Sequence, residues 1–337
     1  MKRQQKSTRI AGLGSALVDL MVHESDEFVR RIGIHKGGMT LVDMSDLEEI
    51  VAQLSTRPIE VPGGSACNTA VGVAQLGGLA RFVGKRGRDE LGRVFDNALA
   101  HRGVEPRLLT SSLPTGRVLS IVTPDAQRTM ITYLGASADT QPQEITPHCF
   151  ADTAVVHMEG YLLFNPDLMT AALMAAKTAG ALISLDLASF TVVRQAKSVL
   201  DDLIVQYVDI LIANEDEALA YTGIQDEAQA LDRLARDTDI AVLKVGARGS
   251  YIQHAGEVFR IPAQGDGTAI DTTGAGDLWA SGFLYGLVNG LGHEKSGQLA
   301  SACGYEVCQV VGADIPVDGW NRIKKNWRQN GQRFNNA

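Results

Sequence analysis

The sequence predicts an α/β protein built on a mostly parallel sheet, with a smaller sheet attached to it. Short runs of apolar and β-branched residues alternate with segments of helical periodicity, which is typical of βαβ units. The 337 residues are 45% hydrophobic and 21% charged, the composition of a globular chain that can bury a sizeable core. Two segments, near 117–133 and 250–261, show instead the alternation of antiparallel hairpins.

The large sheet is expected to use six short apolar strands separated by helices. In one of these helices, 167–178, Leu168, Ala172 and Ala175 recur at helical spacing. The candidate strands are 9–13, 80–83, 154–158, 181–186, 208–213 and 240–245.

The hairpins and the region from about 22 to 61 depart from the βαβ rhythm. One hairpin turns at Pro124-Asp125-Ala126-Gln127 and the other near His254-Ala255-Gly256. We expect one domain over 1–325, in which about 20–60 and 107–137 form a small β-sheet lid and the remainder forms the large α/β part. The polar residues 326–337 are expected to form a loose tail.

Charge and cysteine usage exclude several classes of protein. The chain has 31 Lys and Arg against 39 Asp and Glu, a net charge of −8, so we expect neither a nucleic-acid nor a membrane partner. The four cysteines have no metal-binding spacing and are expected to be reduced thiols. The basic start lacks an apolar stretch, and we expect a cytoplasmic protein.

The segment Asp271–Asp277 (Asp-Thr-Thr-Gly-Ala-Gly-Asp) carries the most chemical information. It is followed by apolar residues at helical spacing: Ala280, Phe283, Leu284, Leu287 and Val288. A small-residue turn at a helix start points N–H groups at an anion, and an acid in that turn suits a base acting beside a transferring phosphoryl group. The alternative is that Asp277 or Thr273 only caps the helix.

This segment resembles the C-terminal signature of the ribokinase/PfkB family of carbohydrate and nucleoside kinases. The family's other signature, a double glycine followed by Asn at a helix start, matches Gly63-Gly64-Ser65-Ala66-Cys67-Asn68. The two motifs occur in the family's order, and weaker matches extend from roughly Ile10 to Pro316. The resemblance implies a ribokinase-like three-layer fold and an ATP-dependent kinase that phosphorylates a hydroxymethyl group.

The resemblance implies catalytic roles at matching positions. Asp277 would deprotonate the hydroxymethyl group, and the amides of Gly274, Ala275 and Gly276 would form the anion hole for the γ-phosphate. Phosphoryl transfer depends mainly on positioning and charge neutralisation, so this division of roles is physically sensible.

The resemblance also assigns the acceptor site. Asp19 would bind two sugar hydroxyls through its two carboxylate oxygens, with the alternative that it caps a turn. Gly63 and Gly64 would let the sugar approach the backbone, and Asn68 would add an amide hydrogen bond. A tight strand-to-helix turn would use the same glycines.

On the nucleotide side, Asn214 and Glu217 match the family's Asn-x-x-Glu motif, which supports Mg²⁺ and phosphates largely through water. An Asn followed three residues later by Glu is also close to a capping box that needs no metal. Gly246 and Gly249 match a turn beside the nucleotide, and Lys244 is placed to reach phosphate or to lie at the surface.

Asp271 and Thr273 correspond to ligands of a monovalent cation in several family members, so K⁺ is a further expected ion whose retention stays open. Gly312-Ala313 matches a turn near the adenine pocket or this cation site. No P-loop motif is present, so the use of ATP rests on the resemblance.

The acceptor stays open between a ribonucleoside and a simple sugar. The segments 36–42, 128–136 and 159–162 resemble the adenosine-kinase-like or general sugar-kinase branch. Met39, Tyr133 and Leu134 could form an apolar shelf for a base. A kinase for fructose, 2-keto-3-deoxygluconate or a sugar phosphate is an alternative, with distal cations available from Lys85, Arg86 and Arg128. So is a non-catalytic binding protein, and a homodimer is left open.

Overall fold

The computed structural model describes residues 7–125, 127–265 and 267–329, and the side chains through 327. Its large sheet has nine strands in the order β14-β13-β12-β11-β10-β9-β1-β5-β6, parallel from β12 to β6, with β13 and β14 antiparallel to their neighbours. The strands are β1 Ile10–Leu13, β5 Ala80–Gly87, β6 Val104–Ser111, β9 Val155–Glu159, β10 Leu182–Asp186, β11 Ile210–Asn214, β12 Ile240–Lys244, β13 Ser250–His254 and β14 Glu257–Ile261.

The sequence-based strand predictions for this sheet are confirmed. The main difference is that the strand beginning at Ala80 continues to Gly87, because β5 pairs with β6 along its whole length. The hairpin of β13 and β14 turns at Ala255 and Gly256, both with positive φ, as its sequence indicates.

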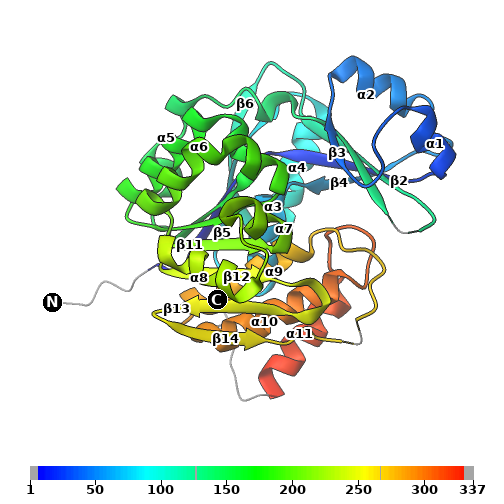
Figure 1. Cartoon of the computed structure of the whole chain (residues 1–337). Helices are drawn as coiled ribbons and strands as arrows, with labels where there is room; N and C mark the ends of the chain where they lie inside the picture. Colours follow the sequence, from blue (N-terminus) through cyan, green and yellow to red (C-terminus); the bar gives the residue numbers. More distant parts are fainter. Residues whose placement is uncertain (1–6, 126, 266, 330–337) are drawn as a thin grey trace.

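Helices cover both faces of the large sheet and make three layers (Figure 1). One face packs against α3 Ser65–Gln75, α4 Glu90–His101, α9 Ala275–Val288, α10 His293–Val307 and α11 Val317–Gln329. The other packs against α5 Pro166–Thr178, α6 Phe190–Tyr207, α7 Glu215–Thr222 and α8 Glu227–Asp237. Alternate strand residues, such as Ile212 and Ala213, join the two apolar clusters on opposite faces, as a strand's period of two requires.

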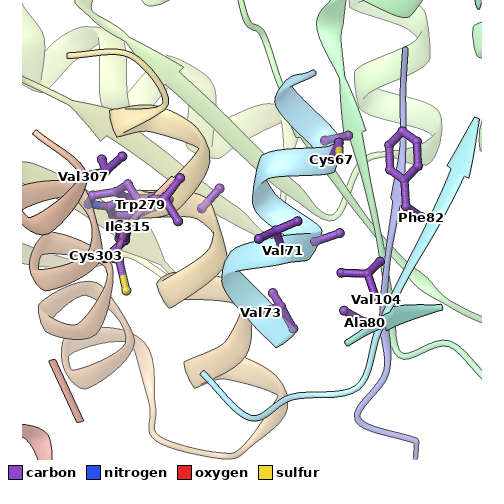
Figure 2. Packing of buried hydrophobic residues seen from close by; sticks show 14 of the residues in the cluster. Cys67, Val71, Val73, Ala80, Phe82, Val104, Trp279, Cys303, Val307 and Ile315 are labelled. Carbon is purple, nitrogen blue, oxygen red and sulfur yellow. The ribbon is translucent and has the colours of Figure 1, made fainter. Parts of the chain in front are cut away.

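Figure 2 shows α3 inside the first of these clusters, between strand residues on one side and the C-terminal helices on the other. Val71 and Val73 of α3 are buried there, and Trp279 of α9 lies on the helical side. Because α3 is packed on both sides, its first turn is held at a fixed place in the fold.

The loose C-terminal tail expected over 326–337 is wrong where the structure describes it. Helix α11 continues to Gln329, and Trp327 is buried. Trp320, Ile323 and Trp327 follow one another at helical spacing and form a single buried apolar stripe. Burial of this stripe stabilises the helix although the residues around it are polar. Residues 330–337 lie outside the described part of the chain.

The smaller sheet has five strands in the order β3-β8-β7-β2-β4. They are β2 Leu17–His23, β3 Met39–Leu41, β4 Ile59–Gly63, β7 Gly116–Val122 and β8 Arg128–Tyr133. Strands β7 and β8 form the antiparallel pair that their alternation indicates, and Ala126 of the expected turn lies outside the described residues. We call this sheet, with helices α1 Asp26–Arg31 and α2 Met44–Val51, the lid.

The expected lid boundary at residue 107 needs correction. Residues 107–111 belong to β6, where they pair with β5 in the large sheet, and the second lid segment starts at Gly116. At the other boundary, β2 begins at Leu17 and β4 extends to Gly63. The apolar residues of β6 do not by themselves show which sheet they join.

The lid has two different faces. On the outer face Leu20, Leu119 and Ile131 are buried in one cluster with Phe28 of α1 and Leu47 of α2. Figure 1 shows both helices at this end of the molecule, beside the lid strands. The residues that alternate with these point to the opposite face, which covers the carboxyl end of the large sheet.

Four short segments join the lid to the large sheet, and they touch in two pairs. One pair is Gly14–Ala16 with Gly63–Ser65, where a Cβ on Gly64 would lie 2.4 Å from the carbonyl oxygen of Ser15. In the other pair, Ala136 donates a backbone hydrogen bond to Pro114 at 2.8 Å. Each pair brings an entering and a leaving segment to one point, which is the geometry of a hinge.

Candidate active site

A cleft of about 290 Å³ lies between the lid and the carboxyl end of the large sheet. Four neighbouring parallel strands each end there in a polar residue: Glu159 of β9, Asp186 of β10, Asn214 of β11 and Lys244 of β12. All four side chains line the cleft. Ligands of open α/β sheets bind at this edge, because the carboxyl ends of parallel strands meet there.

The Asp271–Asp277 segment forms a tight turn that starts α9 at the cleft. Gly274 has φ +72° and Ala275 donates to the Thr272 carbonyl at 3.1 Å, the geometry of a turn that requires glycine at its third position. A Cβ on Gly274 would also lie 2.5 Å from that of Ala313. Ala275 was expected in the anion hole, but its amide is engaged in this turn.

The carboxylate of Asp277 is held by the first turn of α3. Ser65 Oγ donates to Oδ1 at 2.7 Å, and Asn68 Nδ2 donates to Oδ2 at 2.9 Å. Thr69 Oγ1 also donates to the Asp277 carbonyl at 3.1 Å, so the two helix starts are tied together. Burial raises the pKa of Asp277; the hydrogen bonds from Asn68 and Ser65 and the charge of Lys244 counter this rise, and Asp186 adds to it.

Lys244 is the cation beside this turn. Its Nζ donates to Asp186 at 2.8 Å and lies 3.0 Å from the place a Cβ of Gly276 would occupy. Burial lowers the pKa of Lys244, but Asp186 and Glu217 raise it by more, so the ammonium stays charged. Lys244 therefore lies inside the cleft and not at the surface.

Asn214 and Glu217 form the capping box that the sequence offers as an alternative to a metal site. The Asn214 side chain accepts from the Glu217 amide at 2.9 Å, and the Glu217 carboxylate accepts from the Asn214 backbone at 2.8 Å. Both residues also line the cleft. Burial, and next the charge of Asp186, raise the pKa of Glu217 to about 7.

Asp19 of β2 lies across the cleft from Lys244, on the lid side. Burial raises its pKa to about 6, while Arg128 lowers it and Asp277 raises it. Within the described chain no group donates a hydrogen bond to its carboxylate. Its Oδ2 is 2.5 Å from the place a Cβ of Gly63 would occupy, so the carboxylate rests on glycine backbone.

The cleft-facing side of the lid is largely apolar. Met39 and Leu41 of β3, Val118 of β7, Met130 of β8 and Leu134, which follows β8, line it. Tyr133, predicted with Met39 and Leu134 as a shelf, belongs instead to the alternating set that packs against the outer-face cluster. Its odd position in β8 explains the difference, because only the even-numbered residues of that strand face the cleft.

One lid residue reaches across to the turn at the start of α9. Arg128 Nη1 donates to Thr273 Oγ1 at 2.7 Å. Thr273 in turn donates to Asp271 Oδ1 at 2.7 Å, and the amide of Gly312 donates to Asp271 Oδ2 at 2.8 Å. Asp271 therefore stabilises the turn through hydrogen bonds to Thr273 and Gly312. Burial raises the pKa of its carboxyl group, but the hydrogen bonds from the Gly312 amide and then from Thr273 lower it by more.

Several expected residues are not brought to the cleft. Gly246 and Gly249 form a short turn after β12, and Gly63 supports Asp19 from below; none of the three lines the cavity. Lys85 is paired with Asp139 and Glu144, and Arg86 with Asp96, away from the cavity lining.

Other cleft residues escape the sequence reasoning. Glu159, Asp186 and Ser65 contribute to the site, yet each is a single polar residue next to an apolar strand or in a glycine turn. In the sequence, Glu159 and Asp186 are each the carboxylate at the end of an apolar strand. This pattern indicates a site only when the strand order shows that these strand ends lie side by side.

The described residues contain no group of three or more His, Cys, Asp or Glu side chains arranged to hold a metal ion directly. Nor does any helix in this part of the chain have the length and apolar character needed to cross a membrane.

Known proteins resemble the chain in both sequence and structure. The family model described as pfkB family carbohydrate kinase matches residues 34–319. A fructokinase from Klebsiella pneumoniae is 32% identical over 68% of this chain and 78% of its own length. A 5-dehydro-2-deoxygluconokinase from Bacillus subtilis is 29% identical over 71% of this chain and 78% of its own length.

Solved structures match over nearly the whole chain. Adenosine kinase from Sinorhizobium meliloti superposes with a TM-score of 0.87 at 33% identity, covering 95% of this chain and 99% of that one. A probable sugar kinase from Rhizobium etli CFN 42 gives 0.88 at 32% identity, covering 97% and 99%. This chain belongs to the pfkB family of carbohydrate kinases and is a phosphotransferase that acts on an alcohol group.

Proposed function

We propose that this kinase transfers the γ-phosphate of ATP to the hydroxymethyl group of a ribonucleoside, with Asp277 as the general base. The observation that carries the choice of acceptor is the cleft itself, which has a polar floor of carboxylate and amide groups and a mainly apolar roof, in which Asp19, Arg128 and Thr132 are the polar residues. A nucleoside has the same division, because a ribose carries hydroxyls and a base presents flat, weakly polar faces.

The polar groups of the cleft support the roles of Asp277 on the floor and Asp19 on the lid. Asp277 is oriented by Ser65 and Asn68, as a base must be if it is to accept a proton from one hydroxyl. Asp19 has two oxygens and no donor within the described chain, so two neighbouring hydroxyls can supply the missing hydrogen bonds. Gly64 and Asn68 border the same floor.

The other end of the cleft supports the place of the phosphates. The start of α9 and the ammonium of Lys244 both attract anions, and Gly274 and Gly276 allow a phosphate to approach the backbone. Asn214 and Glu217 border this end. We propose that transfer occurs between Asp277 and this turn, and that the lid excludes water which would otherwise hydrolyse ATP.

The carboxylates near Lys244 fit a divalent cation held through water. Asp186, Glu217 and Asp277 have one lysine among them, and their three negative charges exceed its single positive charge. Mg²⁺ keeps several waters and binds few carboxylates directly, in agreement with the absence of a three-ligand cluster in the described residues. When bound, Mg²⁺ neutralises phosphate charge during transfer.

A monovalent cation at Asp271 and Thr273 is not part of this proposal. Both carboxylate oxygens of Asp271 already accept hydrogen bonds, from Thr273 and from the Gly312 amide. Arg128 also brings its positive charge next to Thr273. The cytoplasmic location and the homodimer stay predictions.

The apolar residues of the lid argue against a free sugar as the main acceptor. A sugar has hydroxyls on every side, and those placed against Met39, Met130 and Leu134 would lose hydrogen bonds to water without replacement. A sugar phosphate or sugar acid needs a distal cation; Lys85 and Arg86 are paired elsewhere, but Arg128 lines the cleft and could supply that charge. The sugar-kinase names of the sequence relatives make these compounds necessary members of the test panel.

The test measures ADP release with Mg²⁺ and ATP against adenosine, other nucleosides, ribose, fructose, 2-keto-3-deoxygluconate and sugar phosphates. We expect turnover with a nucleoside, and a loss of about 10²–10⁴-fold in kcat for Asp277→Asn. Turnover with a free sugar alone would refute the choice of acceptor. Near-normal turnover by Asp277→Asn would refute the base, and binding heat without any turnover would indicate a non-catalytic binding protein.

A lid variant tests the apolar roof separately. Met130→Gln should raise KM for the nucleoside by about tenfold while KM for ATP stays within about twofold, because it places an amide against the base. Met174→Gln is the matched control, since Met174 is an exposed residue of α5 outside the cleft. Equal effects of the two variants would contradict the role given to the lid face.

A further inference from the structure

Glu159 is a buried carboxylate that the proposed reaction does not use. It ends β9 at the cleft floor with 1% of its surface exposed. Its Oε1 accepts from the Ser15 amide at 2.8 Å, and its Oε2 accepts from the Ala66 amide at 3.1 Å. An ionised carboxylate is the side chain that can accept from two separate backbone donors in this way.

The two donors belong to the two chain segments that meet at one hinge of the lid. Ser15 lies where the chain enters the lid from β1, and Ala66 lies just after it leaves the lid through β4. A Cβ on Gly14 would lie 2.3 Å from Glu159 Oε2, so the carboxylate fills the space next to the entering segment. One side chain therefore holds the backbone of both segments.

The same contact reaches the proposed general base, Asp277, through α3. Ala66 is in the first turn of α3, between Ser65 and Asn68, and these two donate to the two carboxylate oxygens of Asp277. Glu159 thus fixes this turn from one side while Asp277 is held on the other. A displacement of this turn would change both hydrogen bonds that hold the Asp277 carboxylate.

We propose that Glu159 is a positioning residue, whose carboxylate locks the first turn of α3 to the lid hinge so that Ser65 and Asn68 orient Asp277 toward the acceptor hydroxyl. The inference rests on the proposed function, since it takes Asp277 as the base. No proton is transferred to or from Glu159 in this role. It acts by keeping Asp277 correctly placed relative to the acceptor hydroxyl, and transfer rates are very sensitive to this placement.

Burial and hydrogen bonding have opposite effects on the pKa of Glu159. Burial raises the pKa of Glu159 to about 7, the amides of Ala66 and Ser15 lower it, and Asp277 raises it. The other titratable groups that face it are Cys67 of α3 and Tyr161, which follows β9. The two amides favour the ionised carboxylate, whereas burial favours the protonated form and has the larger effect on the pKa.

The variant Glu159→Gln tests this with little change in volume. A glutamine presents one oxygen and one NH₂ group, so it keeps one of the two hydrogen bonds and opposes an N–H with an N–H. We expect kcat to fall about 10- to 100-fold while KM for ATP and for the acceptor changes less than about threefold. Amide hydrogen exchange should become faster over 64–69 and stay unchanged in the strands at the far edge of the sheet.

Glu306→Gln is the matched control. Glu306 is a buried carboxylate of α10 that pairs with Arg322 away from the cleft, so its loss should lower the unfolding temperature without a specific fall in kcat. A large rise of the acceptor KM in Glu159→Gln with unchanged kcat would overturn the proposal, because it would indicate direct contact with the acceptor. Unchanged exchange over 64–69 would overturn it as well.

Two further measurements separate this inference from the proposed function. If Asp277→Asn keeps its turnover, the base assignment fails, while the exchange experiment still reports whether Glu159 holds the hinge. If Glu159→Gln does not fold, exchange over 64–69 in the unmodified kinase, corrected for intrinsic rates, is measured between pH 6 and 8.5. An opening that releases Glu159 to water lets its pKa fall from about 7 toward 4.5, so it should become easier as the pH rises through 7. Protection that decreases with pH supports the clamp, and protection that is independent of pH overturns it.

Discussion

Helices α3 and α9 both begin at the cleft after a glycine with positive φ, yet their first turns have different surroundings. Gly64, with φ +104°, precedes α3, and Gly274, with φ +72°, precedes α9. The start of α3 is already bonded to a carboxylate, that of Glu159. The start of α9 has instead the ammonium of Lys244 beside Gly276.

This difference bears on which end of the cleft receives which substrate. Helix starts attract anions through their free N–H groups and the helix dipole. At α3 that attraction is satisfied by the protein's own carboxylate, which leaves a site suited to a neutral acceptor. At α9 it is reinforced by a cation, which leaves a site suited to phosphate. The same local turn thus serves two purposes according to the side chain placed next to it.

The largest effect is expected from adding a methyl group to the turn of α9. Gly274→Ala should lower the unfolding free energy by about 2–4 kcal/mol, because it combines a left-handed backbone with a clash against Ala313. Gly276→Ala should stay within about 0.5 kcal/mol, since only the flexible end of Lys244 lies near, and should instead raise KM for ATP. Chemical denaturation and ATP kinetics of the two variants check this, and equal losses of stability would contradict it.

A smaller effect is expected when the cation is removed. Lys244 lowers the pKa of both Asp277 and Glu217, so Lys244→Met should move the acidic limb of the kcat profile to higher pH. The base must be ionised to accept a proton, and a higher pKa therefore costs activity at neutral pH. KM for ATP should rise about tenfold. Lys197→Met, which removes a half-buried lysine of α6 paired with Asp201 away from the cleft, should leave both quantities unchanged.

The smallest effect concerns the thermal stability of the ligand-free kinase. The pKa of Glu159 is about 7 in the folded chain against an ordinary 4.5, so the folded state binds more protons than the unfolded state between these values. The resulting stabilisation is present at low pH and is lost as the pH rises through 7. The unfolding temperature of the unmodified kinase should exceed that of Glu159→Gln by a margin that shrinks between pH 5 and 8. A margin that grows over this range would contradict the raised pKa.

The positions of many strands and helices can be predicted from the local sequence pattern. The strands β1, β5 and β9 to β12 of the parallel sheet are short apolar runs, so their positions could be predicted from periodicity, whereas β6 is only partly buried and was not predicted. The strands β3 and β4 could not, since they are short and partly exposed, and they form because neighbouring lid strands pair with them. Helix α11 was missed because Asn, Arg and Lys surround its stripe of Trp320, Ile323 and Trp327.

The site divides in the same way. The turn that ends in Asp277 is contiguous in sequence, so it could be found as a motif, together with Gly64 and Asn68. Glu159 and Asp186 acquire a role only because four strand ends meet at one edge, which is a property of strand order. Their residue type alone would fit a solvated strand end equally well.

The two faces of the lid separate what holds it together from what it recognises. Leu119 and Ile131 are buried under the lid helices, whereas their neighbours Val118 and Met130 face the cleft. A substitution at a cleft-facing position changes the surface presented to the acceptor and leaves the packing beneath α1 and α2 intact. Substitutions at every second lid residue can therefore change which acceptor is bound. A family that shares this sheet can diversify its acceptors while the lid remains folded.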